Sequence, residues 1–343
     1  SSDLANPEIL WFKMYDGDQV GNSVTRYLNT GGGNVGVTAS LVDDYLTIDG
    51  RPLVGKELLD AKRVYPTELL PTVRDPRLSQ TVALPGQRMQ PAGAGNPYVV
   101  GFPSLAGDGS AFGTNMTGYV MLKHVQIDYT GDYISEYKGS TPAIQFRYAD
   151  VLLNYAEALA EKNGAANAGK IIEILHPLRE RAGMPDIDFD REYNTSAEYP
   201  FRNLDKYIQA VRRERRVEKA LEGRRVFDIM RWAAAEELII GNRAHGALFI
   251  GSNLPEQYGP ELKYDQASGN NMFLTGSPDD AERYILPVPP STMPNGWQFK
   301  PNRDYLLPIQ ERMINVMDGM WEQNPGWRSE ERRVGKECRS RWS

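Results

Sequence analysis

The sequence predicts a mainly α-helical fold of tetratricopeptide-like helical hairpins (an α–α superhelix), with long irregular loops and a few short strands. After Pro142, apolar residues recur at helical spacing in two successive segments, which a short Gly/Ala turn joins into a hairpin of about 34 residues. The 343 residues also include 23 prolines and 32 glycines. That content is high for a helical protein and predicts long ordered loops between the helices.

The hairpin after Pro142 carries the clearest helical pattern. Its first helix places apolar residues on one face: Tyr148, Val151, Leu152, Tyr155, Ala156 and Leu159. Asn163-Gly164 ends this helix, and the second helix, Asn167 to Arg181, stops at Gly183. Its apolar residues are Ile171, Ile174, Leu175 and Leu178. A second pair of helices is predicted over Asp205 to Ala220 and Arg224 to Leu238.

The regions on either side of these helices are richer in turns. Residues 1–30 predict a strand or an irregular segment around the apolar run Ile9 to Phe12, and Val42 to Tyr45 opens a short helix. The glycine-rich stretch 85–118 predicts no helix, whereas residues 120–129 alternate as a strand does. Residues 243–304 are again rich in loops, and 309–317 predicts a last short helix.

A charged stripe lies in the second helical pair. Positions spaced alternately by four and three residues, a seven-residue repeat, lie on one helical face, which we call the seam. The seam has eight residues: Tyr207, Val211, Glu214, Glu218, Leu221, Arg225, Asp228 and Trp232. Four of them are charged, in the stripe where helices normally carry apolar residues. Because Tyr207, Val211 and Trp232 share the face, we expect it to be buried and its charges to be paired.

The pairing predicted for this stripe is a structural ion-pair network. Its expected members are Glu214, Glu218, Glu222, Arg225, Asp228 and Arg231, with Arg215, Arg216 and Arg224 as further donors. Guanidinium groups suit this task because they bind carboxylates with two parallel hydrogen bonds. The network is expected to stabilise the fold rather than to catalyse a reaction.

Four motifs in order resemble the SusD/RagB family of outer-membrane nutrient-binding proteins. The first is FRYADVLLNYAEA at 146–158, and the second is the run RRERRVEKALEGRRVFDIMRW at 212–232. The third comprises the proline-marked turns YILPVP at 284–289 and YLLPI at 305–309. The fourth is the Asn-Pro-Gly-Trp ending at 324–327. Together they extend over more than half of the chain.

The resemblance implies a non-catalytic protein that binds oligosaccharides and delivers them to a SusC-like TonB-dependent transporter. Family members begin with a signal peptide and a lipidated cysteine, so this chain resembles their C-terminal portion. The implied location is the extracellular face of the cell outer membrane, with a lipid tether that this chain does not contain. On this basis the chain divides into a loop-rich middle region (1–141), a SusD-like helical repeat core (142–242) and a loop-rich C-terminal part (243–327).

Residues 328–343 differ in character from the rest. They carry six basic and three acidic residues, include Cys338 as the one cysteine, and show no apolar periodicity. We interpret them as a tail that does not belong to the natural protein.

Composition excludes several classes of function. A net charge of −6 argues against a nucleic-acid partner, and no run of 18 apolar residues could span a bilayer. The three histidines are scattered, so no metal site or cofactor is predicted. No Gly-x-Ser-x-Gly, P-loop or His-Glu-x-x-His motif is present.

Ligand binding is assigned to aromatic residues on loops, because sugars lay their apolar C–H faces on aromatic rings. The candidates are Asn96, Tyr98, Phe102, Phe112 and Trp297. They rest on loop position and chemistry alone, Asn96 as a hydrogen-bond partner for sugar hydroxyls, since the family motifs do not include the ligand surface. Trp11 and Trp232 are expected in the core instead. The alternatives are a peptide-binding member of the family, a glycoside hydrolase, and an intracellular helical-repeat scaffold.

Overall fold

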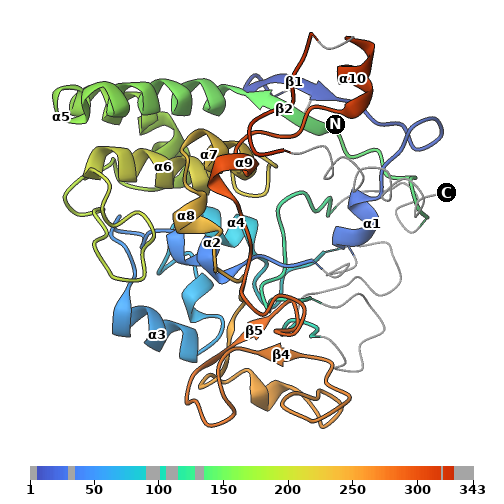
Figure 1. Cartoon of the computed structure of the whole chain (residues 1–343). Helices are drawn as coiled ribbons and strands as arrows, with labels where there is room; N and C mark the ends of the chain where they lie inside the picture. The colour runs from blue at the N-terminus through green and yellow to red at the C-terminus, as the bar shows by residue number, and fades with distance from the viewer. Residues whose placement is uncertain are drawn as a thin grey trace. The chain divides into compact units, whose positions relative to one another are not determined.

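The computed structural model describes residues 6–29, 35–89, 101–105, 115–127, 135–317 and 320–327. Most of its regular structure is helical, with short strands and long loops between the helices (Figure 1). The chain forms two compact units, one of residues 1–223 and 244–292 and the other of residues 224–243 and 293–343. This composition confirms the predicted fold class.

Helix α5 (Tyr148–Ala182) contains the predicted hairpin in the first unit. Asn163 interrupts it with φ −173° and ψ 90°, far from helical values, at the point where the sequence predicted the turn. The chain reverses there, because Arg147 and Arg181, at the two ends of α5, both contact Glu218. A straight helix of 35 residues would hold its ends about 52 Å apart. Gly183, at φ 73°, provides the left-handed cap that ends α5.

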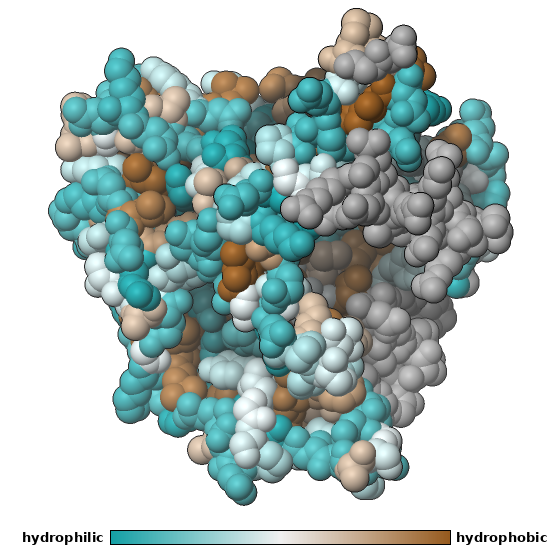
Figure 2. Space-filling model, viewed as in Figure 1, coloured by the Kyte–Doolittle hydropathy of each residue, from teal (hydrophilic) through white to brown (hydrophobic). Residues whose placement is uncertain are grey.

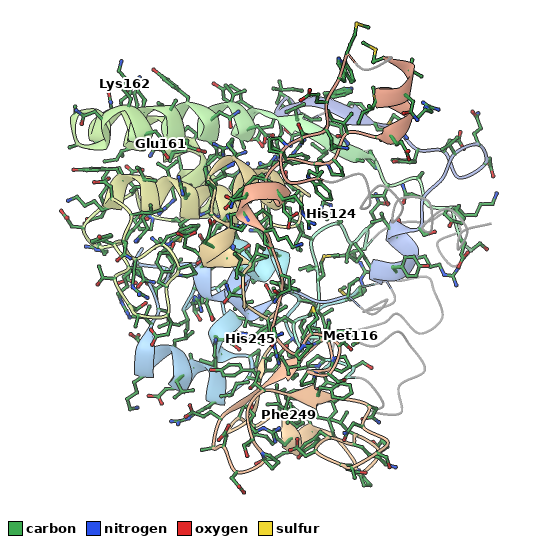
Figure 3. The ribbon with its side chains drawn as sticks, viewed as in Figure 1. Met116, His124, Glu161, Lys162, His245 and Phe249 are labelled. Carbon is green, nitrogen blue, oxygen red and sulfur yellow. The ribbon has the colours of Figure 1, made fainter. Side chains whose placement is uncertain are left out.

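The two halves of α5 enclose a small core against α6 (Lys206–Glu218). The buried side chains from α5 are small or aliphatic: Ala149, Leu153, Ala156, Ala160, Ile171, Ile174, Leu175 and Leu178. At the turn, Gly164 packs against Tyr207 of α6, and Glu161 pairs with Arg212 at 3.1 Å. Figure 3 labels Glu161 and Lys162 near this end of α5.

The buried face of α5 differs from the predicted one. Ala149 and Leu153 are fully buried, whereas Tyr148, Val151 and Tyr155 are about half exposed, between 48 and 50%. The helix is apolar on two sides, and the periodic pattern could not show which side faces the core. The small residues lie inside because neighbouring helices approach closely there.

The strand predicted at the start of the chain is present. Strand β1 (Ile9–Lys13) pairs antiparallel with β2 (Ala143–Arg147), which leads directly into α5. The backbone N–H of Tyr148 donates to the carbonyl of Glu8 at 2.7 Å and extends the pairing into the first turn of the helix. β1 and β2 therefore position the beginning of α5.

Short helices and an antiparallel sheet surround a second core in the same unit. The helices are α1 (Val24–Asn29), α2 (Ala39–Asp44), α3 (Gly55–Arg63), η2 (Thr67–Leu69), α4 (Arg77–Thr81) and η3 (Pro255–Gln257). The sheet has the order β3 (Leu248–Ile250), β5 (Arg283–Leu286), β4 (Phe273–Leu274). Tyr45, Tyr119 and Phe249 are fully buried in this core, and Figure 3 labels Phe249, which belongs to β3.

Two of the predicted elements take another form. The predicted helix at Val42 is the end of α2, and Asp49-Gly50 after it forms a turn, with the N–H of Gly50 donating to the carbonyl of Thr47. The strand predicted from Val120 is wrong over its described part, residues 120–127, where Met121 makes only an isolated bridge to Val82.

The second unit consists of α7 (Arg225–Arg231), α8 (Ala235–Leu238), α9 (Pro301–Asp304) and α10 (Glu311–Val316). α10 lies where the last short helix was predicted. The continuous helix predicted over Arg224 to Leu238 is wrong, since Ala233 has φ 49° between α7 and α8. The two compact units do not end at the predicted boundaries at 141/142 and 242/243. Those boundaries stay predictions about the organisation of the sequence.

Candidate functional site

A buried carboxylate, Glu218 at the end of α6, joins distant parts of the first unit. Oε1 of Glu218 lies 2.6 Å from Nη1 of Arg147 and 2.6 Å from Nη2 of Arg181. Its Oε2 lies 3.1 Å from Nη1 of Arg77 in α4. Burial alone would raise the pKa of Glu218, but the positive charges of Arg147, Arg77 and Arg181 outweigh it and lower the pKa to about 2. Glu218 is therefore ionised at neutral pH.

Glu214, one helical turn earlier, is buried equally deeply. Nη1 of Arg77 lies 2.6 Å from its Oε1, and Nε of Arg179 lies 2.5 Å from its Oε2. Arg179 also donates to Glu192 at 3.0 Å. Burial raises the pKa of Glu214, but Arg179 and Arg77 bring it below the usual value. α4, α5 and α6 are thus joined by charge-assisted hydrogen bonds inside the protein.

Glu222 extends the network beyond the end of α6. Its carboxylate lies 2.7 Å from Lys123, 2.8 Å from Arg147 and 2.6 Å from Lys219. Burial opposes ionisation of Glu222, but the hydrogen bond from Arg147 and the neighbouring cations lower its pKa. Because Glu214, Glu218 and Glu222 hold no proton at neutral pH, they are unsuited to act as general acids there.

The cationic partners come from parts of the sequence that the seam did not indicate. Arg77, Arg147 and Arg179 face these carboxylates, in place of the expected Arg215 and Arg216. Arg215 donates instead to Asn154 at 2.9 Å, and Arg216 pairs with Asp44. The only signal in the sequence for these partners was the presence of Arg77 after Asp75-Pro76 and of Arg147 before Tyr148. Neither arginine lies on the charged helix.

The seam itself is interrupted. Leu221 and Gly223 have φ values of 62° and 72°, so α6 and α7 are separate helices. Arg225, Asp228 and Arg231 belong to the second unit, where Nη2 of Arg231 lies 3.0 Å from Oδ1 of Asp228. Arg225 and Arg231 also lie 5.5 and 5.2 Å from the ring of Trp232. The prediction that one helical face carries all eight residues is wrong.

The structure describes only some of the predicted ligand residues. Asn96, Tyr98 and Phe112 lie outside the described residues. Phe102 is 36% exposed, and its ring centroid lies 6.0 Å from that of the buried Tyr65. The next residue, Pro103, accepts a hydrogen bond of 2.6 Å from the hydroxyl of Tyr258. One face of Phe102 is thus anchored to the core while the side chain reaches solvent.

Trp297 is half-buried and belongs to the second unit. Its backbone N–H donates to the carbonyl of Asn242 at 2.9 Å, and its carbonyl accepts from Gly241 at 2.9 Å. The nearby amide of Gln298 donates to the carbonyls of Asn295 and Gly296. These contacts hold the loop of Trp297 in place.

An exposed aromatic surface was missed by the sequence reasoning. Trp11, expected in the core, is 61% exposed and stacks on Phe146, with an interplanar angle of 13° and ring centroids 6.0 Å apart. Trp11 and Phe146 are cross-strand neighbours on an exposed face of the β1–β2 pair. In Figure 2, hydrophobic side chains reach the surface along the top of the view, where α5 meets β1 and β2.

The described residues contain neither a helix that could cross a membrane nor a cluster of metal ligands. No described helix has the length and hydropathy that crossing a membrane requires. Within the same residues, no three or more His, Cys, Asp or Glu side chains gather as ligands for a metal ion.

A comparison with known families decides the identity of the fold. The sequence profile of the SusD family matches residues 7–327, which include all the elements described above. The chain belongs to the SusD family.

Solved structures agree with this assignment. A SusD-like protein from Bacteroides fragilis superimposes with a TM-score of 0.61 at 21% identity, over 95% of this chain and 55% of its own. A SusD-like carbohydrate-binding protein from the same species gives 0.59 at 22% identity, over 91% of this chain and 54% of its own. At such identities the likeness establishes the fold. The SusD-family chain spans about half the length of these relatives, and no curated protein matches it significantly.

Two of the motifs that carried the SusD resemblance contribute to the ion-pair network. Arg147 follows Phe146 in the first motif, and Glu214, Glu218 and Glu222 are acidic positions of the second. Their burial and pairing explain why a scaffold built on this hairpin needs these residue types at these spacings.

Proposed function

We propose that this protein binds oligosaccharides on its surface without cleaving them and passes them to a TonB-dependent outer-membrane transporter. The observation that carries the proposal is membership of the SusD family over residues 7–327. A structural relative in the family is described as a carbohydrate-binding protein, which supports glycans as the ligand class. The proposed location is the extracellular face of the outer membrane.

The proposed ligand contacts are residues on loops: the aromatic Tyr98, Phe102, Phe112 and Trp297, and the amide side chain of Asn96. Phe102 supports this assignment because its ring rests on Tyr65 and its loop is held by Tyr258. An aromatic ring that is already ordered loses little conformational entropy when a sugar stacks on it. The ion-pair network then acts as a rigid frame within the first unit.

A binding panel tests the ligand class. Neutral and acidic oligosaccharides and a set of peptides of similar length are titrated into the protein by calorimetry. Binding of at least one oligosaccharide, without release of new reducing ends, is the expected result. Peptide binding alone would identify a peptide-binding member of the family. Reducing ends that disappear when one carboxylate is changed to its amide would identify a glycoside hydrolase.

Delivery needs a separate test. The intact gene product, tagged and purified from outer membranes in mild detergent, should co-isolate with a TonB-dependent transporter. Recovery of the protein from the cytoplasm, with no transporter bound, would favour the intracellular scaffold instead.

A further inference from the structure

A buried carboxyl group in the first unit is connected to the support of Phe102. Glu68 in η2 is 1% exposed, and the hydroxyl of Tyr119 donates to its Oε1 at 2.7 Å. Among the described residues, none forms a hydrogen bond with its Oε2. A buried carboxylate that is ionised needs donors at both oxygens, so these contacts disfavour the charged form. Burial accordingly raises the pKa of Glu68 to about 7.

The charged neighbours of Glu68 come from several elements. Asp43 of α2 adds a second negative charge, whereas Lys62 of α3 and Arg74, which follows η2, add positive charges. Lys62 pairs with Asp43 at 2.8 Å, and Arg74 donates to two backbone carbonyls at the end of α2. Both cations thus have partners other than the carboxylate of Glu68. Three tyrosines whose pKa values burial raises also interact with Glu68: Tyr65, Tyr119 and Tyr284.

Tyr65 links Glu68 to the loop that carries Phe102. We call residues 101–105, which include Phe102, the ligand loop. Residues 64–69 form one compact turn, in which backbone hydrogen bonds of 2.7 and 2.8 Å tie Tyr65 closely to Glu68. The ring of Tyr65 lies against Phe102, with centroids 6.0 Å apart, and its hydroxyl donates to the carbonyl of Gly118 at 3.3 Å. A displacement of η2 that gives Glu68 access to water therefore also moves the support of Phe102.

Tyr119 provides a second connection to the ligand loop. It ends a turn that begins at Asn115, whose backbone N–H donates to the carbonyl of Ser104 at 2.6 Å. The side-chain oxygen of Asn115 accepts hydrogen bonds of 3.0 and 2.6 Å from two backbone N–H groups inside this turn. The turn thus contacts Glu68 at one end and the ligand loop at the other.

We propose that Glu68 is a proton switch for ligand binding: its neutral form holds the ligand loop in the binding conformation, and its ionised form releases the loop through Tyr65 and Tyr119. The inference rests on the proposed function, because Phe102 is assigned there as a ligand contact. It adds the regulation of that site. In this arrangement η2 is the element that moves, and the ligand loop responds to it.

The direction of the switch follows from linkage. The closed arrangement raises the pKa of Glu68 to about 7, whereas a carboxyl group that is open to water keeps a pKa near 4.5. Closure is therefore fully favoured below about pH 4.5, and this contribution is lost as the pH rises through about 7. Ligand affinity should fall over the same range, and binding near pH 7 should take up protons.

Calorimetry tests the switch with each oligosaccharide that binds in the panel. Affinity should be weaker by at least about threefold at pH 8 than at pH 5.5. At pH 7, proton uptake should appear as a difference in binding enthalpy between phosphate and Tris buffers. Glu68→Gln should bind equally well at both pH values, because the amide does not titrate. Glu256→Gln, exposed on η3, is the control and should retain the wild-type dependence.

The outcomes separate the switch from the proposed function. If an oligosaccharide binds with an affinity that does not depend on pH, the switch is wrong and the ligand class stands. The same conclusion holds if Glu68→Gln keeps the wild-type dependence. If no oligosaccharide binds, the proposed function fails, and the opening of η2 is decided without a ligand.

Hydrogen exchange measures that opening in the ligand-free protein. The amides of Tyr65, Thr67 and Leu69 are hydrogen-bonded in the closed arrangement. Their protection factors should fall by at least about threefold from pH 5.5 to pH 8, and more than that of Leu153 in α5. Glu68→Gln should abolish the difference. An equal fall at Leu153, or an unchanged fall in Glu68→Gln, would overturn the switch.

Tyr119→Phe distinguishes a switch from simple support. The hydrogen bond from Tyr119 lowers the pKa of Glu68, because it stabilises the ionised form. Its removal should therefore shift the midpoint of the pH dependence of protection to higher pH. Weaker protection at every pH with an unchanged midpoint would show that Tyr119 only supports the turn, and would contradict the proposal.

Discussion

Arg147 and Arg181, which lie at opposite ends of α5, donate to the same oxygen of Glu218 at 2.6 Å each. This relationship requires the hairpin to be closed, because the two guanidinium groups meet only when the halves of α5 run back along each other. The side chains of Glu218 and Arg147 are 3% and 11% exposed, so this pair is shielded from water, whereas Arg181 is 44% exposed. The fold therefore brings these charges together, and their pairing in turn stabilises the closed hairpin.

Glu218→Ala should destabilise the protein by about 3 kcal/mol, because it removes one of the carboxylates that balance the buried charges of Arg147 and Arg77. Urea unfolding measures the loss as a shift of the midpoint. Glu173→Ala is the control, since its pair with Lys170 is exposed and should contribute less than about 0.5 kcal/mol. A loss below about 0.5 kcal/mol for Glu218→Ala would mean that the network does not support the fold.

Glu68 should make stability depend on pH near neutrality. It is 1% exposed, and burial raises its pKa to about 7 although Lys62 acts in the opposite direction. Tyr119 donates to its Oε1 at 2.7 Å, while Asp43 and Arg74 are the other charged neighbours. The folded state keeps the proton of Glu68 where the unfolded chain has lost it. Stability should therefore fall as the pH rises from about 4.5 to about 7, by up to about 3 kcal/mol.

Glu68→Gln isolates this effect, because the amide imitates the protonated carboxyl and does not titrate. Unfolding free energies at pH 5 and pH 7.5 should differ less in this variant than in the wild type. Glu256→Gln, at an exposed position, should retain the wild-type difference. If Glu68→Gln also retained it, Glu68 would not be the group responsible.

Gly164 and Gly169 should respond in opposite ways to alanine. A Cβ at Gly164 would collide with Tyr207, so Gly164→Ala should cost about 1–3 kcal/mol. A Cβ at Gly169 would meet nothing within 4 Å, and Gly169→Ala should gain about 0.5–1 kcal/mol from helix propensity. Thermal unfolding of both variants provides the comparison. Equal effects would show that the hairpin turn is not packed on α6.

Phe102→Ala should weaken binding of the oligosaccharide found in the panel by at least about tenfold, with little change in melting temperature. Tyr98→Ala should behave in the same way if Tyr98 shares the surface. Tyr193→Ala is the matched control, since Tyr193 is 38% exposed in the loop before α6. If binding and melting temperature fell together in Phe102→Ala, the ring would be an anchor for its loop rather than a ligand contact.

The sequence indicated the helical hairpin because its signals are local. Asn163-Gly164 and Gly183 mark the turn and the end in terms of backbone conformation, which needs no knowledge of the rest of the chain. The burial of Glu214 and Glu218 could likewise be inferred from the apolar neighbours on their helical face. The family motifs at 146–158 and 212–232 added the family resemblance, which the SusD match over residues 7–327 then confirmed.

Tertiary structure decided the partners and the faces. Arg77 reaches Glu214 across 137 residues, and no pattern within the charged helix could point to it. The sequence also left open which side of α5 faces the core, because the helix is apolar on two sides. Ala149 and Leu153 lie on one of these sides, and Tyr148 and Tyr155 lie on the other. Trp11 lies in an apolar run, yet it is exposed because its side chain is on a solvent-facing side of the β1–β2 pair. Local conformation is encoded by neighbouring residues, whereas charge pairing and burial depend on which distant segments the fold brings together.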